Sequence, residues 1–132
     1  MATFKVKGGV KLKGDLHPQG AKNEALQVLC AILLTPEEVI MENVPNIRDV
    51  NILIDLLRDL NVSVNQINES TYGFKADNVD IDYLSSDDYK VKSSRIRGSM
   101  MIVGPLLARY GKGYIPKPGG DKIGRRRLDT HF

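Results

Sequence analysis

The chain has 132 residues, of which 42% are hydrophobic and 27% charged, so its composition excludes collagen-like, disordered and coiled-coil classes and allows at most one globular domain. The longest strongly apolar run, Ala25 to Leu34, is about half as long as a membrane span, and the N-terminus lacks a signal-peptide layout, so we expect a cytoplasmic protein with no membrane partner. One cysteine, Cys30, and two distant histidines predict no internal disulfide and no metal site, and we expect no cofactor.

The charge is distributed unevenly along the chain. Residues 1–89 carry 8 basic and 14 acidic side chains, whereas residues 90–132 carry 11 basic and 2 acidic ones, for a net charge of only +3. We expect the C-terminal third to face anions, which could be nucleic acid, phosphorylated metabolites or acidic lipids. The alternative is a basic face that only interacts with solvent.

The N-terminal segment predicts a hairpin, then a helix, then a strand. Residues 4–7 and 10–13 alternate between apolar and basic around Gly8-Gly9, which is typical of a β-hairpin. Residues 21–34 are dense in Ala and Leu and predict a helix buried on several sides, ended by Pro36. Residues 38–42 predict a short strand.

The middle of the chain predicts an amphipathic helix followed by a pair of strands. Asp49 is the expected N-cap of this helix. Strands are predicted at 62–64 and 72–76, paired around a turn at 68–70, and the acidic stretch 77–88 is expected to be a surface excursion. The expected apolar stripe of the helix consists of Val50, Leu53, Ile54, Leu57 and Leu60.

A second buried helix is predicted from about 94 to 110, ended by Gly111 and followed by a strand around 114–115. It repeats the first unit, because both helices begin with a cation, Lys22 or Arg97. We therefore expect two similar helix-and-strand units with largely buried helices, one complete and one only begun. Since such repeats bury their faces against neighbours, a chain end just inside a loop predicts a piece of a longer protein.

Two stretches contain residues that could bind an anion or transfer a proton. At 20–23 a glycine turn leads into a helix, so backbone N–H groups, the helix dipole and the Lys22 ammonium could hold an anion; the alternative is a lysine that only faces solvent. At 118–127 three glycines and three arginines suit a phosphate ligand. Asp121 within this stretch is either a turn-forming residue or a proton carrier.

Together these stretches resemble the UDP-N-acetylglucosamine 1-carboxyvinyltransferase family of enolpyruvyl transferases. The resemblance covers nearly the whole chain in order. It is carried by Phe4-Lys5-Val6-Lys7-Gly8-Gly9, Gly20-Ala21-Lys22-Asn23-Glu24-Ala25-Leu26, Asn43-Val44-Pro45 with Asp49-Val50, Arg97-Gly98-Ser99, Gly104-Pro105-Leu106-Leu107-Ala108-Arg109 and Pro118-Gly119-Gly120-Asp121-Lys122-Ile123-Gly124.

The resemblance implies an α/β fold, the inside-out α/β barrel of repeated βαβαββ units found in these two-domain enzymes. This chain would contain about one and a half units. Residues 1–21 would be a hairpin and linker belonging to the other domain of the full enzyme, and residues 22–132 would be a partial enolpyruvyl transferase domain.

The implied activity is enolpyruvyl transfer from phosphoenolpyruvate to the 3-hydroxyl of UDP-N-acetylglucosamine with release of phosphate, the first committed step of peptidoglycan synthesis. Lys22 and Asn23 match the pair that contacts phosphoenolpyruvate. The residues implied to bind the sugar nucleotide are Arg97, Arg126, Arg127, Leu128, Asp129 and Thr130. We expect Lys22, Arg97 and Arg126 to lie close enough to share anionic ligands.

The chain departs from the family pattern in two places. Asp121 stands where the family usually has a cysteine that donates a proton and is alkylated by fosfomycin, although some members carry aspartate; the implied role is proton donor, with resistance to the drug. Arg127-Leu128 replaces the usual Pro-Val. Cys30 is expected to be a small core residue and not a substitute thiol.

In the family, the general base lies beyond the position of Phe132, so these 132 residues alone are expected to be inactive. They are also expected to self-associate through faces that other repeats normally cover.

Two alternative functions remain open from the sequence. A relative that transfers enolpyruvyl to shikimate 3-phosphate shares the architecture, but its early motif resembles Gly-Ser-Lys-Ser and not the Gly-Ala-Lys-Asn of residues 20–23. A non-enzymatic nucleic-acid module could use Arg125 to Arg127 on phosphates. Because no aromatic residues are interleaved with these arginines, we expect no nucleic-acid partner.

Overall fold

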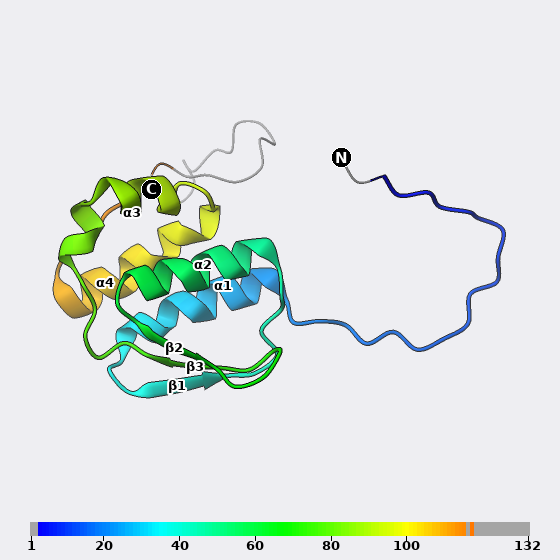
Figure 1. Cartoon of the computed structure of the whole chain (residues 1–132), viewed down its shortest axis with the longest axis horizontal. Helices are drawn as coiled ribbons and strands as arrows, with labels where there is room; N and C mark the ends of the chain where they lie inside the picture. The colour runs from blue at the N-terminus through cyan, green and yellow to red at the C-terminus, as the bar shows by residue number, and fades with distance from the viewer. Residues whose placement is uncertain (1–2, 116, 118–132) are drawn as a thin grey trace.

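A computed structural model describes residues 3–115 and 117. Within them, a three-stranded antiparallel sheet is covered on one face by two helices, and further helical segments pack on the other side of that pair (Figure 1). The elements in chain order are α1 (Lys22–Ala31), η1 (Ile32–Leu34), β1 (Glu38–Met41), α2 (Arg48–Asp59), β2 (Ser63–Gln66), β3 (Tyr72–Lys75), η2 (Asp82–Ser85), α3 (Asp87–Ser93), η3 (Arg97–Ile102) and α4 (Val103–Tyr110).

The strand order is β1-β3-β2, with β3 antiparallel to both neighbours, so β1 and β2 run parallel and α2 is the crossover between them. In the register, Val39 and Val64 flank Phe74, and this face carries the apolar side chains toward the helices. Phe74 is fully buried as a result. The predicted strands at 38–42, 62–64 and 72–76 are confirmed, and Asn68 Oδ1 accepts from Ser70 N at 2.9 Å in the turn between the last two.

The two helices on the sheet form the core, as their sequence patterns predict. Leu29 and Leu33 of the first helical segment are fully buried, while Val28 and Leu34 lie on its outer side. The predicted stripe on α2 is buried without exception, since Val50, Leu53, Ile54, Leu57 and Leu60 are all at most 2% exposed. The mixed helix and sheet agree with the predicted α/β class.

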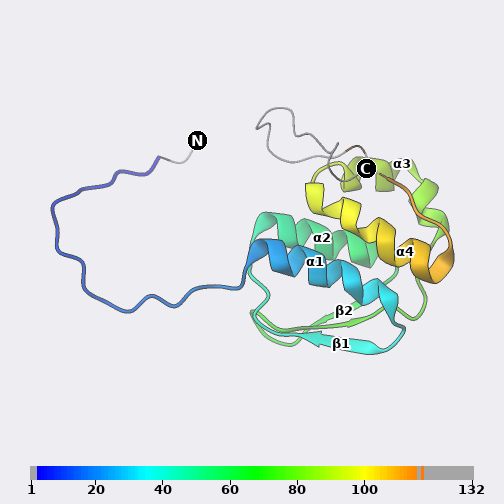
Figure 2. The ribbon, with the colours of Figure 1, turned by 180° about the vertical axis from the view of Figure 1, so that it is seen from behind.

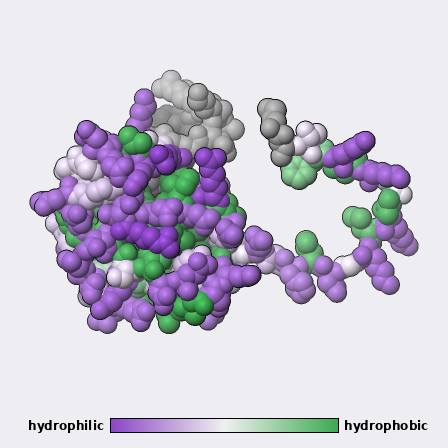
Figure 3. All heavy atoms as spheres, in the orientation of Figure 1, coloured by the Kyte–Doolittle hydropathy of each residue, from purple (hydrophilic) through white to green (hydrophobic). Residues whose placement is uncertain are grey.

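The predicted hairpin at 4–7 and 10–13 is wrong, because residues 3–19 form no strand and extend away from the helices and sheet in both views (Figures 1 and 2). Phe4 and Leu12 are each 92% exposed, and apolar and polar residues alternate along this segment in the space-filling view (Figure 3). An isolated two-stranded hairpin is marginal in water unless its apolar face packs against something, which explains why the alternation alone does not produce one here.

The predicted helix at 94–110 is divided in two. Its first part is the 3-10 segment η3, and α4 begins only at Val103. Pro105 has no N–H to bond the carbonyl of Met101, and its ring would crowd that carbonyl, so a continuous α-helix is disfavoured there. Gly111 ends α4 in the left-handed conformation at φ 66°, as predicted.

The second helical unit is less buried than predicted, because Met101 and Leu107 are half exposed. The predicted strand at 114–115 is absent. Tyr114 instead packs its ring edge-on against Tyr89 at 5.9 Å between centroids. Within residues 103–115, the connection after α4 therefore differs from the one after α1, and the repeat argument is not supported there.

The acidic stretch 77–88 is more ordered than a surface excursion. Ser86 caps α3 by accepting from Tyr89 N at 3.0 Å, and Asp87 and Asp88 occupy the first turn, where the helix dipole favours negative charge. Leu84 and Tyr89 are buried and hold this segment against the rest of the fold.

Arg109 on α4 is hydrogen-bonded through one guanidinium nitrogen to two other segments, residues 33–35 and Ala76. Its Nη1 donates to the carbonyls of Leu33 at 3.3 Å, Thr35 at 3.2 Å and Ala76 at 2.6 Å. We expect Arg109→Leu to lower the free energy of unfolding by about 2–4 kcal/mol, because three partly buried carbonyls lose a charged donor. Urea denaturation measures this change.

The matched control for that measurement is Arg58→Leu, whose guanidinium pairs with Asp55 at 2.8 Å on the surface. Exposed pairs of this kind contribute at most about 1 kcal/mol. Equal losses for the two variants would show that Arg109 does not fasten α4.

Candidate functional site

Three helical elements begin at the same end of the molecule. α1, α2 and the η3–α4 pair run side by side with their first residues toward the point where residues 3–21 leave the fold (Figures 1 and 2). The first residue of each is basic: Lys22, Arg48 and Arg97. Three cations therefore lie at one end of the described residues, together with Glu24 and Asp49 in the first turns of α1 and α2.

The N-termini of these elements have no side-chain cap in the part of the chain that the structure describes. The residues before them are Ala21, Ile47 and Ile96, whose apolar side chains have no atom that can accept a hydrogen bond from the first turn. The backbone N–H groups there have no intrahelical partner, and a cation at a helix start is disfavoured by about 0.3–1 kcal/mol through the dipole. Free donors combined with cations are chemically suited to an anionic ligand.

Lys22 is held but remains accessible. Its Nζ lies 3.1 Å from Asp49 Oδ2, and the two side chains are 42% and 41% exposed. The pair joins the first turns of α1 and α2. Asp49 is therefore not the N-cap that the sequence predicted, because α2 begins earlier at Arg48 and Asp49 lies in its first turn.

Arg97 is brought close to the N-terminal half of α1 by the residue that follows it. A Cβ on Gly98 would stand 3.2 Å from Leu26 Cδ1, so η3 approaches α1 closely within one turn of Lys22. Asn23 and Arg97 are both exposed. This packing agrees with a site to which Lys22, Asn23 and Arg97 contribute, and their binding roles stay predictions.

The remaining predicted site residues lie outside the described residues. These are Asp121, Arg126, Arg127, Leu128, Asp129 and Thr130. The proposed sharing of ligands between Lys22 and Arg126 therefore stays a prediction. The structure adds Arg48, which the sequence pattern does not indicate because Asp49 carries the N-cap signal of this helix.

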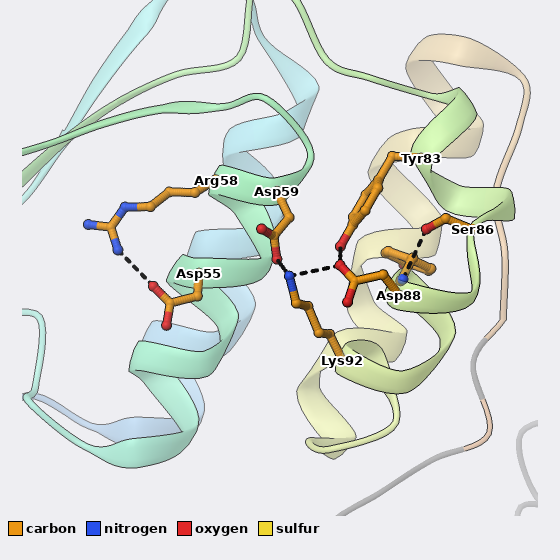
Figure 4. A network of polar contacts seen from close by, with 8 residues as sticks. Asp55, Arg58, Asp59, Tyr83, Ser86, Asp88 and Lys92 are labelled. Carbon is orange, nitrogen blue, oxygen red and sulfur yellow. Dashed lines mark hydrogen bonds and ion pairs between the residues drawn. The ribbon is translucent and has the colours of Figure 1, made fainter.

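Another polar cluster lies at the junction of α2 and α3, and there two carboxylates surround one lysine (Figure 4). Lys92 Nζ lies 2.7 Å from Asp59 Oδ2 and 2.8 Å from Asp88 Oδ2, and Tyr83 Oη donates to Asp88 at 2.6 Å. The hydrogen bond from Lys92 holds the pKa of Asp88 below its usual range, and burial is the main cause that raises the pKa of Tyr83 to about 12. Because carboxylates already neutralise Lys92, this cluster fastens α3 and offers no surplus positive charge.

Cys30 is buried in α1, as predicted, at 2% exposure. Burial raises the pKa of its thiol to about 12. Such a thiol stays protonated and unreactive at neutral pH, so it does not replace a catalytic thiolate.

The described residues contain no group of three or more potential metal ligands, and no helix among them is long and apolar enough to span a bilayer.

Burial also raises the pKa of Tyr89 to about 12, and its hydroxyl has no hydrogen-bond partner among the described residues. Cys30 and Tyr89 both deprotonate at lower pH in the unfolded chain, so we expect stability to fall as the pH rises from about 9 toward 12. Tyr89→Phe should reduce this alkaline loss and, at neutral pH, leave stability unchanged or raise it by about 1 kcal/mol. Urea midpoints measured across this pH range test it; an unchanged alkaline slope in the variant would contradict it.

The family model described as EPSP synthase (3-phosphoshikimate 1-carboxyvinyltransferase) matches residues 6–132. The chain is 59% identical over 132 residues to a protein of Bacteroides fragilis and 55% identical over 132 residues to one of Porphyromonas gingivalis, both named UDP-N-acetylglucosamine 1-carboxyvinyltransferase. These matches cover 100% of the chain and 30% of each relative, so the chain spans under a third of their length.

A solved structure has a similar fold. The enolpyruvyl transferase NikO from Streptomyces tendae matches 79% of the chain and 23% of its own, with a TM-score of 0.61 and 23% sequence identity. At this identity the match supports the fold alone.

Proposed function

Since the chain belongs to the EPSP synthase family, we propose that it forms part of an enzyme that transfers the enolpyruvyl group from phosphoenolpyruvate to the 3-hydroxyl of UDP-N-acetylglucosamine. The single observation that supports the chemistry best is the common end of α1, α2 and η3, where each element begins with a cation and no side-chain cap among the described residues. The choice of acceptor rests on the 59% identity to relatives with that name.

In this proposal the substrates account for the charge. Phosphoenolpyruvate carries a phosphate and a carboxylate, and the sugar nucleotide carries a diphosphate. A site that holds both must offer several cations and backbone donors in fixed positions, because such preorganised groups stabilise developing charge without reorganisation. Lys22, Arg48 and Arg97 are first residues of elements built on a packed core, which meets this requirement.

The proposed roles follow the family resemblance. Lys22 and Asn23 bind phosphoenolpyruvate, while Arg97 and the segment Arg126 to Thr130 bind the sugar nucleotide. The sugar hydroxyl adds to C2 of phosphoenolpyruvate as Asp121 delivers a proton to C3. The proton of the sugar hydroxyl leaves to a general base, and the tetrahedral adduct then loses phosphate from C2 and a proton from C3 to give the enolpyruvyl ether. A carboxylic acid can serve as donor if closure of the site raises its pKa toward neutrality.

The reaction would take place in the cytoplasm as the first committed step of peptidoglycan synthesis, so its loss would affect the cell wall, cell shape and cell division. No cofactor and no nucleic acid are required. The 132 residues alone would be inactive and would self-associate through exposed apolar side chains such as Val28, Met101 and Leu107.

The test compares two acceptors in a protein of the relatives' full length. Phosphate release from phosphoenolpyruvate should require UDP-N-acetylglucosamine and should not occur with shikimate 3-phosphate. Release with shikimate 3-phosphate alone would transfer the assignment to the activity in the family description. Salt-dependent binding of an oligonucleotide, with no release in either case, would favour the nucleic-acid alternative.

A further inference from the structure

Gly20, two residues before Lys22, passes directly against the loop that follows β1. A Cβ at this position would overlap the carbonyl oxygen of Asn43 and would stand 3.2 Å from both the carbonyl carbon of Asn43 and Cδ of Pro45. Only a residue without a side chain can follow this path, so the contact requires glycine.

The obstructing carbonyl is not free to move. It belongs to the peptide unit whose N–H, on Val44, donates to Ser70 O at 2.8 Å, which fastens the loop to the turn between β2 and β3. Val44 and Pro45 are buried, and Asn43 holds a left-handed φ of 56°. An added methyl group at Gly20 must therefore be accommodated by movement of Gly20 itself.

Movement of Gly20 is transmitted to the first turn of α1. The next residue, Ala21, accepts the first helical hydrogen bond from Ala25 N at 3.0 Å, and Lys22 follows with its Nζ on Asp49. The deeper part of the helix is anchored, since Leu29 is fully buried. The displacement would thus be confined to the turn that carries Lys22 and Asn23.

We propose that Gly20 is a positioning residue, whose lack of a side chain lets the fixed Asn43 carbonyl set the place of Lys22 and Asn23. The inference rests on the proposed function for its kinetic consequence. The displacement of the first turn of α1 follows from the contact between Gly20 and Asn43 and does not depend on the proposed function.

The structural experiment records amide spectra of the 132-residue chain with Gly20→Ala. The matched control is Gly104→Ala, because a Cβ at Gly104 in α4 would meet nothing within 4 Å. We expect the amides of Lys22 and Asn23 to shift in the first variant only, while Leu53 keeps its position. Shifts at Lys22 and Asn23 no larger than in the control, or loss of the folded spectrum, would overturn the proposal.

The kinetic experiment uses a protein of the relatives' full length. Gly20→Ala should lower kcat/KM for phosphoenolpyruvate by about ten- to a hundredfold through a raised KM, because small displacements of a binding group have effects of this size. The KM for the sugar nucleotide and the melting temperature should change little, and Gly104→Ala should behave as the parent. An unchanged KM for phosphoenolpyruvate would overturn the proposal, whereas an inactive parent would overturn the proposed function and leave the amide shifts to decide on Gly20.

Discussion

Asp121→Asn should slow turnover by about two to four orders of magnitude in a protein of the relatives' full length, because the amide cannot deliver the proton that C3 of phosphoenolpyruvate requires. The parent should also lose activity as the pH rises through the pKa of Asp121 in the closed site, since only the neutral acid donates. Rates of phosphate release measure both effects. Unimpaired turnover by the Asn variant would show that Asp121 is a turn residue and that another group donates the proton.

Asp121→Cys is the matched control for that experiment. A thiolate attacks an epoxide far more readily than a carboxylate does, so this variant should keep turnover and become sensitive to covalent inactivation by fosfomycin, while the parent resists it. Cys30 does not offer a second thiolate for the drug to alkylate, because its buried thiol has a pKa of about 12. Inactivation of the parent by the drug would contradict the assignment of Asp121 to this position.

Lys22→Ala should lower kcat/KM for phosphoenolpyruvate by about a hundred- to a thousandfold, as expected when a preorganised positive charge is removed from a site that binds an anion. Stability should change by at most about 1 kcal/mol, because the ion pair with Asp49 is more than a third exposed. Steady-state kinetics and urea denaturation measure the two quantities separately.

The matched control is Lys75→Ala, which removes another half-exposed lysine paired with a carboxylate, Asp77, at 2.9 Å. It should reproduce the small change in stability and leave kcat/KM unaltered. If both variants lost activity equally, Lys22 would have no specific role in binding.

The core elements could be predicted because the spacing of their apolar residues indicates which face of each element is buried. The stripe on α2 from Val50 to Leu60 and the strand around Phe74 follow the patterns of a helix on a sheet, and both are buried. The hairpin at 4–13 has an equally clear pattern but no surface within the described residues to cover it. Local alternation specifies a strand only when one face is buried.

The predicted site was incomplete for a different reason. Lys22 and Arg97 could be identified from the sequence, but Arg48 could not, because α2 begins after Ile47, an apolar residue that gives no N-cap signal. The close approach at Gly20 depends on the backbone of Asn43, which is distant in sequence. Only the folded chain shows that these helix starts share one end.

The most direct test of this shared anion site is a titration of the isotope-labelled 132-residue chain with phosphoenolpyruvate, followed through backbone amide shifts. The largest shifts should map to Lys22 and Asn23, with smaller shifts at the neighbouring Arg48 and Arg97, and added salt should weaken them, since the attraction is between exposed charges. Shifts concentrated instead around Arg58, Lys92 and Arg95, or no shifts at the starts of α1, α2 and η3, would contradict the account.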